Sequence, residues 1–196
     1  MTESPFIGLL RLILKWLMKL FLHLKGFKTV NGAKLPTTQQ SYIVIANHAA
    51  FIDSIYMICS LKPRLTICGA KPKYFSTPFK RFIMRLGGII KVDTPAQLIK
   101  DCVAFLANNQ VILIYPEMGR NKAELGKFKT YAAEVSNKSS IPVIPCYIYS
   151  TTVGQSGAPR VIVGDPIPPI SDAVELTDQY RRAILELKAS LNGVAS

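Results

Sequence analysis

Residues 43–54 constrain the fold of this chain more than any other stretch. The segment begins with an apolar run typical of a buried strand, breaks at Asn47 and His48, and continues with apolar residues at helical spacing. A strand that turns directly into a helix is typical of α/β folds, and its junction lies beside the free N–H groups of the helix start. His48 therefore lies where an imidazole can be used for chemistry.

Asp53 follows His48 closely enough across this turn for its carboxylate to accept a hydrogen bond from one ring nitrogen. Such a bond fixes the tautomer and leaves the second nitrogen free to take a proton from a substrate hydroxyl. In a different interpretation, Asp53 or Ser54 only caps the helix and His48 is an ordinary loop residue. The spacing alone leaves both interpretations open.

A second segment has the same character, because an apolar run at residues 111–115 ends in a proline, an acid, a glycine and an arginine. Together the two segments resemble the glycerolipid acyltransferase (PlsC-like) family, whose motifs are N-H-x-x-x-x-D and F-P-E-G-T-R. The residues that match these motifs are Asn47, His48 and Asp53 in the first and Tyr115, Pro116, Glu117 and Arg120 in the second. Met118 and Gly119 stand where the family usually has Gly and Thr.

Three weaker matches follow the order of the family's other conserved blocks. They are residues 87–93 in the place of the second block, the basic segment 126–132, and the proline-flanked segment 141–145. The resemblance spans roughly residues 40 to 165. Several blocks in one order are far more specific than any single motif.

Alternating strand and helix patterns predict the fold class. We expect strands at residues 42–46, 65–69, 111–115, 145–149 and 160–163. We expect helices from the His48 turn to about residue 62, at 95–107 with Thr94 as N-cap and Pro95 at N1, at 123–136 and at 176–191. This order predicts an α/β fold with a mostly parallel sheet flanked by helices.

The N-terminal residues 6–24 form an apolar helix pattern interrupted by a stripe of cations at every fourth position. These are Arg11, Lys15, Lys19 and His23. A spanning helix would bury three cations in the bilayer, whereas an interfacial amphipathic helix keeps them at the headgroups with Trp16 at the boundary. We therefore expect a membrane-interface helix at 1–27 and an acyltransferase domain at 28–196. The alternative is a helix packed on the core of the domain.

Charge and composition point to the same kind of partner. The 196 residues carry a net charge of +12 and are 49% hydrophobic, with a mean hydropathy of +0.24. This combination suggests an anionic membrane surface, and we expect no nucleic-acid partner because basic-aromatic patches, zinc spacings and helix-turn-helix patterns are not evident. The scattered cysteines indicate a reducing compartment. We expect membrane association on the cytoplasmic face of the inner or plasma membrane.

Residues 71–85 mix cations with aromatic and aliphatic side chains. Such a mixture suits a segment that lies against lipid or grips an anionic ligand beside an acyl chain. An ordinary amphipathic helix with a solvated cationic face explains the pattern equally well.

The resemblance implies acyl transfer from a thioester to a hydroxyl, with His48 as base and Asp53 as its orienting partner. It implies that Arg120 holds a phosphate of the acceptor and that Glu117 orients this arginine or a substrate hydroxyl. Backbone N–H groups near the helix start are expected to stabilise the oxyanion. The further candidates for substrate binding are Gly119, Asn47, Lys122 and Lys129, the two lysines being alternatively simple surface charges.

The expected acceptor is a lysophospholipid, first of all 1-acyl-glycerol-3-phosphate, which would give phosphatidic acid. Acyl-CoA or acyl carrier protein would be the co-substrate, and no metal or cofactor is expected. Because Met118 and Gly119 depart from the motif, another lysolipid or a lipid-like metabolite is an alternative acceptor. Alternatives of another class are a non-catalytic membrane-binding protein on the same scaffold and a basic nucleic-acid binder.

Overall fold

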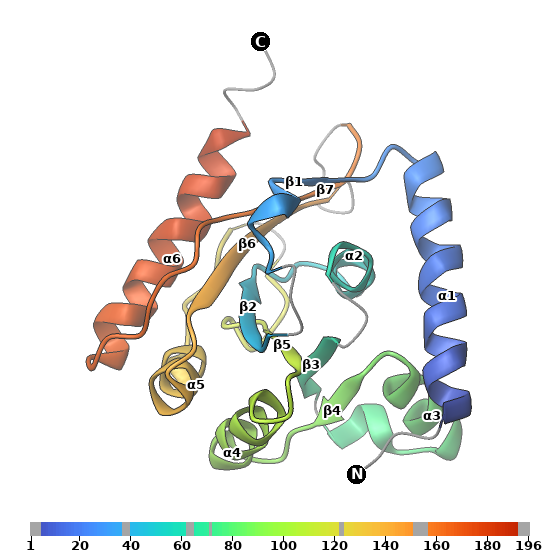
Figure 1. Cartoon of the computed structure of the whole chain (residues 1–196), viewed down its shortest axis with the longest axis horizontal. Coiled ribbons are helices and arrows are strands. Elements are labelled where there is room, and N and C mark those ends of the chain that lie inside the picture. Colours follow the sequence, from blue (N-terminus) through green and yellow to red (C-terminus); the bar gives the residue numbers. More distant parts are fainter. Residues whose placement is uncertain are drawn as a thin grey trace.

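A seven-stranded sheet forms the centre of the molecule, with strand order β1-β7-β6-β2-β5-β3-β4 (Figure 1). The structure is a computed structural model that describes residues 5–36, 40–61, 65–70, 72–121, 124–150 and 157–191. The strands are β1 Lys28–Val30, β2 Tyr42–Ala46, β3 Leu65–Ala70, β4 Ile89–Lys91, β5 Val111–Ile114, β6 Val143–Tyr149 and β7 Arg160–Val163. Neighbouring strands are parallel except β6 and β7, which are antiparallel. The predicted α/β fold with a mostly parallel sheet is confirmed.

Helices cover both faces of this sheet. They are α1 Pro5–Leu24, α2 Ile52–Ser60, α3 Pro78–Leu86, α4 Pro95–Leu106, α5 Tyr131–Ser139 and α6 Ala173–Ser190, with short 3-10 turns η1 Gly32–Lys34 and η2 Pro72–Phe75. Every residue of β2 is buried. Val44 and Ala46 pack in the apolar layer that includes α2 and part of α1, whereas Ile43 and Ile45 pack in the layer of α4, α5 and α6. An uninterrupted apolar run suits a central strand that is covered on both sides.

The register of the central strands determines which loops meet. β2 lies between β5 and β6, with Ile45 beside Ile114 and Ala46 beside Cys146. The three strands are parallel, so their carboxyl ends lie together at one end of the sheet. The segments that follow β2 and β5 therefore emerge side by side, and they carry the two motifs.

Local signals fixed several helix ends where we expected them. Thr94 caps α4, accepting a hydrogen bond from the backbone N–H of Gln97 (3.2 Å), and Pro95 occupies the first turn. Gly26 follows α1 with a φ of 76°, the left-handed conformation that commonly terminates a helix. Both features confirm the boundaries predicted from the sequence.

The helix predicted at residues 123–136 is wrong for its first half. Residues 124–130 contain no helix, and α5 begins only at Tyr131. The backbone N–H of Gly126 donates to the Glu117 carboxylate (2.7 Å) and that of Lys129 donates to the carbonyl of Pro116 (2.9 Å). These bonds hold the segment as a loop against the end of β5, because tertiary contacts outweigh local helix propensity.

α1 packs on the body by only one edge. Leu22 is buried and Met18 packs beside it, so the alternative of a helix packed on the core holds for this edge alone. Lys15 was expected at the headgroups, but its Nζ donates to the carbonyl of Leu61 just after α2. Burial lowers the pKa of Lys15 to about 8. Among the described residues, no helix has the length and apolar character needed to cross a membrane.

The described cysteine side chains belong to the core, as expected. Cys59 and Cys146 lie in the layer with α2, Cys102 lies in the opposite layer, and none of these three forms a disulfide. Burial raises the pKa of the Cys59 and Cys146 thiols, which keeps them protonated. The side chain of Cys68 lies outside the described part of the structure.

Candidate active site

His48 and Asp53 form a hydrogen-bonded pair at the carboxyl end of β2. The distance between His48 Nδ1 and Asp53 Oδ2 is 3.2 Å. Because the carboxylate acts as acceptor, we assign the ring proton to Nδ1, which leaves Nε2 as the basic nitrogen. The His48 side chain keeps 14% of its exposure, whereas that of Asp53 keeps 1%. The imidazole of His48 is therefore partly accessible, whereas the carboxylate that it contacts is buried.

Asp53 is fixed by the backbone of the turn that precedes its own helix. The N–H groups of Ala49 and Ala50 each donate to Asp53 Oδ2 at 2.7 Å. These bonds fix the position of the carboxylate at the start of α2. Asp53 therefore does both things that its spacing allowed. It stabilises the turn before α2, and it hydrogen-bonds the imidazole of His48. The expected oxyanion donors cannot include these two N–H groups, because Asp53 uses both.

Tyr115 supports the other side of the imidazole. Its ring stacks on His48 with centroids 4.0 Å apart and an interplanar angle of 15°. The Tyr115 hydroxyl lies 3.2 Å from Ser54 Oγ on α2. Burial raises the pKa of Tyr115 far above its ordinary value, so its hydroxyl stays neutral and able to hydrogen-bond Ser54. The imidazole is thus held between a carboxylate and an aromatic ring.

Glu117 joins three backbone segments around the site. Its Oε1 accepts from the backbone N–H of His48 (2.9 Å), and its Oε2 accepts from Asn121 Nδ2 (2.6 Å) and the N–H of Gly126 (2.7 Å). The N–H of Asn121 in turn donates to the carbonyl of His48 (2.8 Å). The expected orientation of Arg120 by Glu117 is therefore not the arrangement found, since both carboxylate oxygens bind the protein itself.

Asn47 links β2 to β6. Its Nδ2 donates to the carbonyl of Ile148 (3.1 Å), and its Oδ1 accepts from the N–H of Ile148 (2.7 Å). This pair of bonds closes the gap where the two parallel strands separate. Asn47, which we predicted as a substrate-binding residue, has its carboxamide committed to the backbone.

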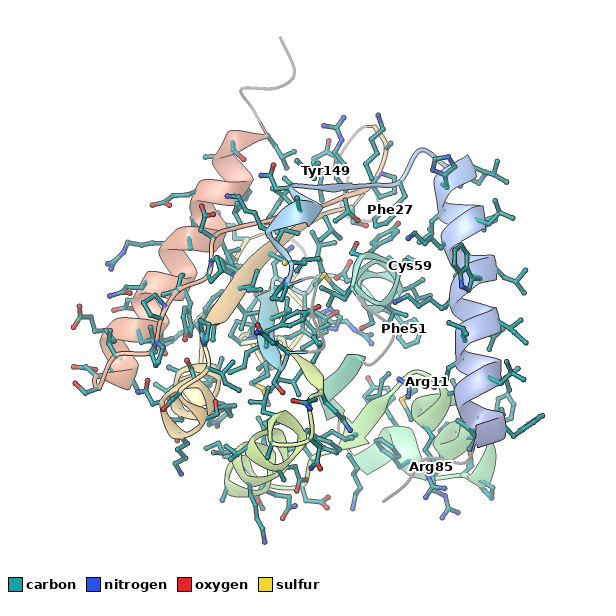
Figure 2. All side chains as sticks on the ribbon, viewed as in Figure 1. Arg11, Phe27, Phe51, Cys59, Arg85 and Tyr149 are labelled. Atoms are coloured by element: carbon teal, nitrogen blue, oxygen red, sulfur yellow. The ribbon has the colours of Figure 1, made fainter. Side chains whose placement is uncertain are left out.

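Arg120 lies at the exposed rim of the site. Its guanidinium carbon is 5.9 Å from the centroid of the Phe51 ring, at the start of α2. Figure 2 shows Phe51 beside this helix. Phe51 is about half exposed, so the pair leaves the fork of Arg120 accessible to an anionic group. Arg120 directly precedes Asn121, whose backbone N–H donates to the carbonyl of His48, so this cation lies on the loop beside His48.

The other predicted binding residues differ in placement. Gly119 and Lys129 are exposed, and Lys122 lies outside the described residues. Met118 has a φ of 53°, a left-handed conformation in which a side chain costs roughly 1–2 kcal/mol. Its side chain packs against the apolar layer of α4, α5 and α6. Met118 is thus partly buried against the core, on the face of the sheet opposite α2.

Sequence reasoning missed four residues that hold the site: Ser54, Tyr115 as a stacking partner, Asn121 and Gly126. The one available signal was the aromatic residue directly before Pro116, at the end of a buried strand. Among the described residues, no three His, Cys, Asp or Glu side chains group together as metal ligands.

Comparisons with known proteins point in one direction. Residues 28–149 match the family model described as Acyltransferase. A chloroplastic 1-acyl-sn-glycerol-3-phosphate acyltransferase of Brassica napus is 28% identical over 167 residues, which are 78% of this chain and 48% of the relative. An enzyme of the same name from Streptococcus pneumoniae is 26% identical over 157 residues, covering 76% of this chain and 58% of its own length. The chain thus spans about half the length of these curated relatives.

A solved structure has the same fold. The crystal structure of the 1-acyl-sn-glycerophosphate acyltransferase PlsC from Thermotoga maritima superposes with a TM-score of 0.72 and 17% sequence identity. The match covers 95% of this chain and 82% of the other. At this identity the likeness establishes the fold, while the matched family model carries the relationship.

Proposed function

Because this chain belongs to the acyltransferase family, we propose that it moves a fatty acyl group from a thioester to the hydroxyl of a lysophospholipid. The observation that carries this proposal is the accessible His48, bonded to the buried Asp53 and standing near Arg120 in the second motif. The acyl donor is acyl-CoA or acyl carrier protein, since both present the same thioester.

In the proposed reaction, His48 Nε2 takes the proton of the acceptor hydroxyl as its oxygen attacks the thioester carbonyl carbon. The tetrahedral intermediate then collapses, the C–S bond breaks, and the imidazolium returns the proton to the departing thiolate. Asp53 stabilises the imidazolium and holds the tautomer. A nucleophilic serine or cysteine is not needed, because the acceptor supplies the nucleophile.

The acceptor that the site suits best is 1-acyl-glycerol-3-phosphate, which gives phosphatidic acid. The exposed guanidinium of Arg120 can bind a phosphate through two parallel hydrogen bonds. The curated relatives are named for this acceptor. Because Met118 packs into the core, its departure from the motif gives less reason to expect another lysolipid or lipid-like metabolite, which remains the second candidate.

Membrane association is part of the proposal, with residues 1–27 as the interfacial element of an acyltransferase domain at 28–196. The face of α1 turned away from the body carries exposed large apolar side chains, which are Phe6, Leu9, Leu12, Ile13, Trp16, Leu17, Leu20, Phe21 and Leu24. Lys19 lies at the margin of this face, with Nζ 6.0 Å from the Trp16 ring centroid. An apolar face bordered by cations suits the cytoplasmic surface of an anionic membrane.

An acyl-transfer assay read by mass spectrometry tests the proposed reaction. Wild-type protein is offered 1-acyl-glycerol-3-phosphate, other lysophospholipids and monoacylglycerol, each with acyl-CoA and with acyl carrier protein. We expect product with the phosphate-bearing acceptor. If folded, vesicle-bound protein gives no product with any pair, the non-catalytic membrane-binding alternative replaces this proposal.

Arg120→Gln tests the phosphate assignment in the same assay. We expect about a tenfold or greater rise in KM for the phosphate-bearing acceptor, because a charged hydrogen bond contributes about 1.5–3 kcal/mol. Arg181→Gln on α6 is the control, since it removes the same charge from an exposed position. An equal rise in KM for both variants would show that Arg120 does not bind the phosphate. So would an equal rise in the KM of Arg120→Gln for monoacylglycerol, which has no phosphate.

A further inference from the structure

The helix α3 exposes the side chains that a soluble domain normally buries. Phe79, Phe82 and Ile83 are exposed by 73%, 42% and 37%, whereas the buried residue of this helix is Met84. In an ordinary surface helix the apolar face turns toward the core. Here the aromatic face turns away from it.

The positions around the helix confirm that this is one continuous face. Successive residues rotate by about 100°, which places Phe79, Phe82 and Ile83 within one arc and Met84 on roughly the opposite side. Thr77 caps the helix and Pro78 occupies its first turn, so the start of the helix is fixed by the sequence. The exposure follows from how the helix is seated on the body.

Cations border the aromatic face. Lys80 and Arg85 lie about 60° beyond the two edges of this arc, and Arg81 lies farther round the helix. All three are exposed, and the helix contains no acidic residue. Apolar side chains flanked by cations match the layered chemistry of a bilayer surface, where acyl chains lie beneath anionic phosphates. An acidic protein would pair with the cations of α3, but its charged surface would match the outward aromatic side chains less well than acyl chains do.

α3 lies beside α1, whose outer face is also exposed and apolar. Figure 1 shows α3 beside the N-terminal end of α1, and Figure 2 shows Arg11 of α1 and Arg85 of α3 on this same side of the molecule. The exposed Phe6 and Leu9 belong to this end of α1. α6 lies on the opposite side of the sheet in the same view.

We propose that α3 is a second lipid-binding element, which inserts Phe79, Phe82 and Ile83 into an anionic bilayer surface with its cations at the phosphates. The inference rests on the proposed membrane role of α1 and adds a second, separate contact. If α1 alone bound the membrane, the domain could rotate about the axis of this helix. Two helices in contact with the same leaflet fix the orientation of the His48 site toward the membrane.

A relocated tryptophan tests the insertion directly. Trp16 is the single tryptophan of the chain, so Trp16→Phe combined with Phe79→Trp places the only indole on α3. Vesicles of phosphatidylcholine and phosphatidylglycerol with bromine atoms on the acyl chains quench an inserted indole. We expect a blue shift and quenching for this variant. Trp16→Phe with Val174→Trp is the control on α6, where exposed Val174 is expected to stay unquenched.

Paired charge removals test the role of the cations. Lys80→Gln with Arg85→Gln should weaken binding to the anionic vesicles by about twenty- to thirtyfold, since each cation near an anionic surface strengthens binding. Arg181→Gln with Arg182→Gln on α6 lowers the net charge equally and should change binding by no more than about twofold. Equal losses in the two pairs would show that overall charge acts alone, which would overturn the inference.

The wild-type Trp16 signal separates this inference from the membrane role of α1. Quenching of Trp16 without quenching at position 79 would overturn the role of α3 and leave α1 and acyl transfer intact. A blue shift at position 79 with an acidic acyl carrier protein, but no quenching by lipid, would assign the face to a protein partner and reject the lipid surface. Lost acyl transfer with retained quenching at both positions would reject the proposed function alone.

Discussion

The chemistry at the residue scale depends on side chains that position His48 without reaching a substrate. Asp53, Tyr115 and Glu117 each contact a different part of this residue, namely the ring nitrogen, the ring face and the backbone N–H. Mutations in this set should therefore separate the geometry of the base from the binding of lipid. Substitutions at Tyr115 and at Gly126 test two of these contacts.

Tyr115→Phe removes the hydroxyl and keeps the stacked ring. We expect kcat within about threefold of wild type and a stability loss of about 1 kcal/mol, since Ser54 loses its buried partner. Tyr115→Leu also removes the ring and should lower kcat by about tenfold or more through a less ordered imidazole. Steady-state kinetics and urea unfolding measure both effects. Equal kcat for the Phe and Leu variants would show that the stack has no role.

Gly126→Ala introduces a methyl group into the Glu117 network. A Cβ at this position would lie 2.4 Å from Asn121 Nδ2 and 2.7 Å from Glu117 Oε2. The loop must therefore move, at a cost of about 1–3 kcal/mol for overpacking, and kcat should fall with it. Gly8→Ala on α1, where a Cβ meets nothing within 4 Å, is the matched control. Unchanged activity and stability in Gly126→Ala would contradict this network.

The sequence predicted the His48 and Asp53 pair because these residues are neighbours across one turn. It did not predict that Asn47 binds Ile148 or that Glu117 binds the backbone of His48, since these partners are 101 and 69 positions apart. Only the strand register brings them together. Short-range contacts of this site were thus predictable from spacing, and long-range ones required the fold.

At the scale of elements, α2 connects α1 to the His48 and Asp53 pair. Asp53 lies in the first turn of α2, and the carbonyl of Leu61, just after its last turn, accepts from Lys15 of α1. The central strand β2 and helix α4 were predictable from apolar runs and capping residues. The short strands β1 and β4 were not, because a three-residue segment has no periodicity and exists only through its neighbour in the sheet.

Lys15 gives this connection a pH dependence. Burial first, and then the like charges of Lys19 and Arg11, lower the pKa of Lys15 from 10.5 to about 8. Below pH 8 the lysine is protonated whether the chain is folded or unfolded. Between about pH 8 and 10.5 only the unfolded chain holds the proton, so this residue's contribution to the free energy of unfolding rises with pH.

Lys15→Met removes this contribution. Unfolding of both proteins by urea, without vesicles, should show the Met variant gaining most relative to wild type below pH 8, with the gain shrinking toward pH 10. Both proteins carry Cys59→Ala in this comparison, because burial raises the pKa of the Cys59 thiol and its charge interacts with that of Lys15. A constant difference across this range would show that Lys15 keeps its proton in the folded chain.

The whole molecule is arranged with two chemically different sides. α1 and α3 present apolar side chains and cations on one side of the sheet, and α6 covers the other (Figure 1). The carboxyl ends of β2, β5 and β6 hold the candidate site between these sides. The net charge of +12 and the high hydrophobic fraction, both visible in the sequence, are explained by this arrangement. The outward direction of the α3 face was not predictable, since periodicity shows that a face exists and not where it points.

The central claim is that His48, held by Asp53, is the base of acyl transfer. The most direct measurement is the acyl-transfer rate of His48→Ala and Asp53→Asn, with vesicle binding of each variant measured in parallel. His23→Ala is the control, because His23 is the only other histidine of the chain.

We predict a fall in kcat of about 100- to 10,000-fold for His48→Ala, since a positioned general base contributes this much. Asp53→Asn should lose about 100-fold or more. Both variants should bind vesicles like wild type, and His23→Ala should keep the wild-type kcat. Turnover by His48→Ala at the wild-type rate, from folded and vesicle-bound protein, would contradict the account.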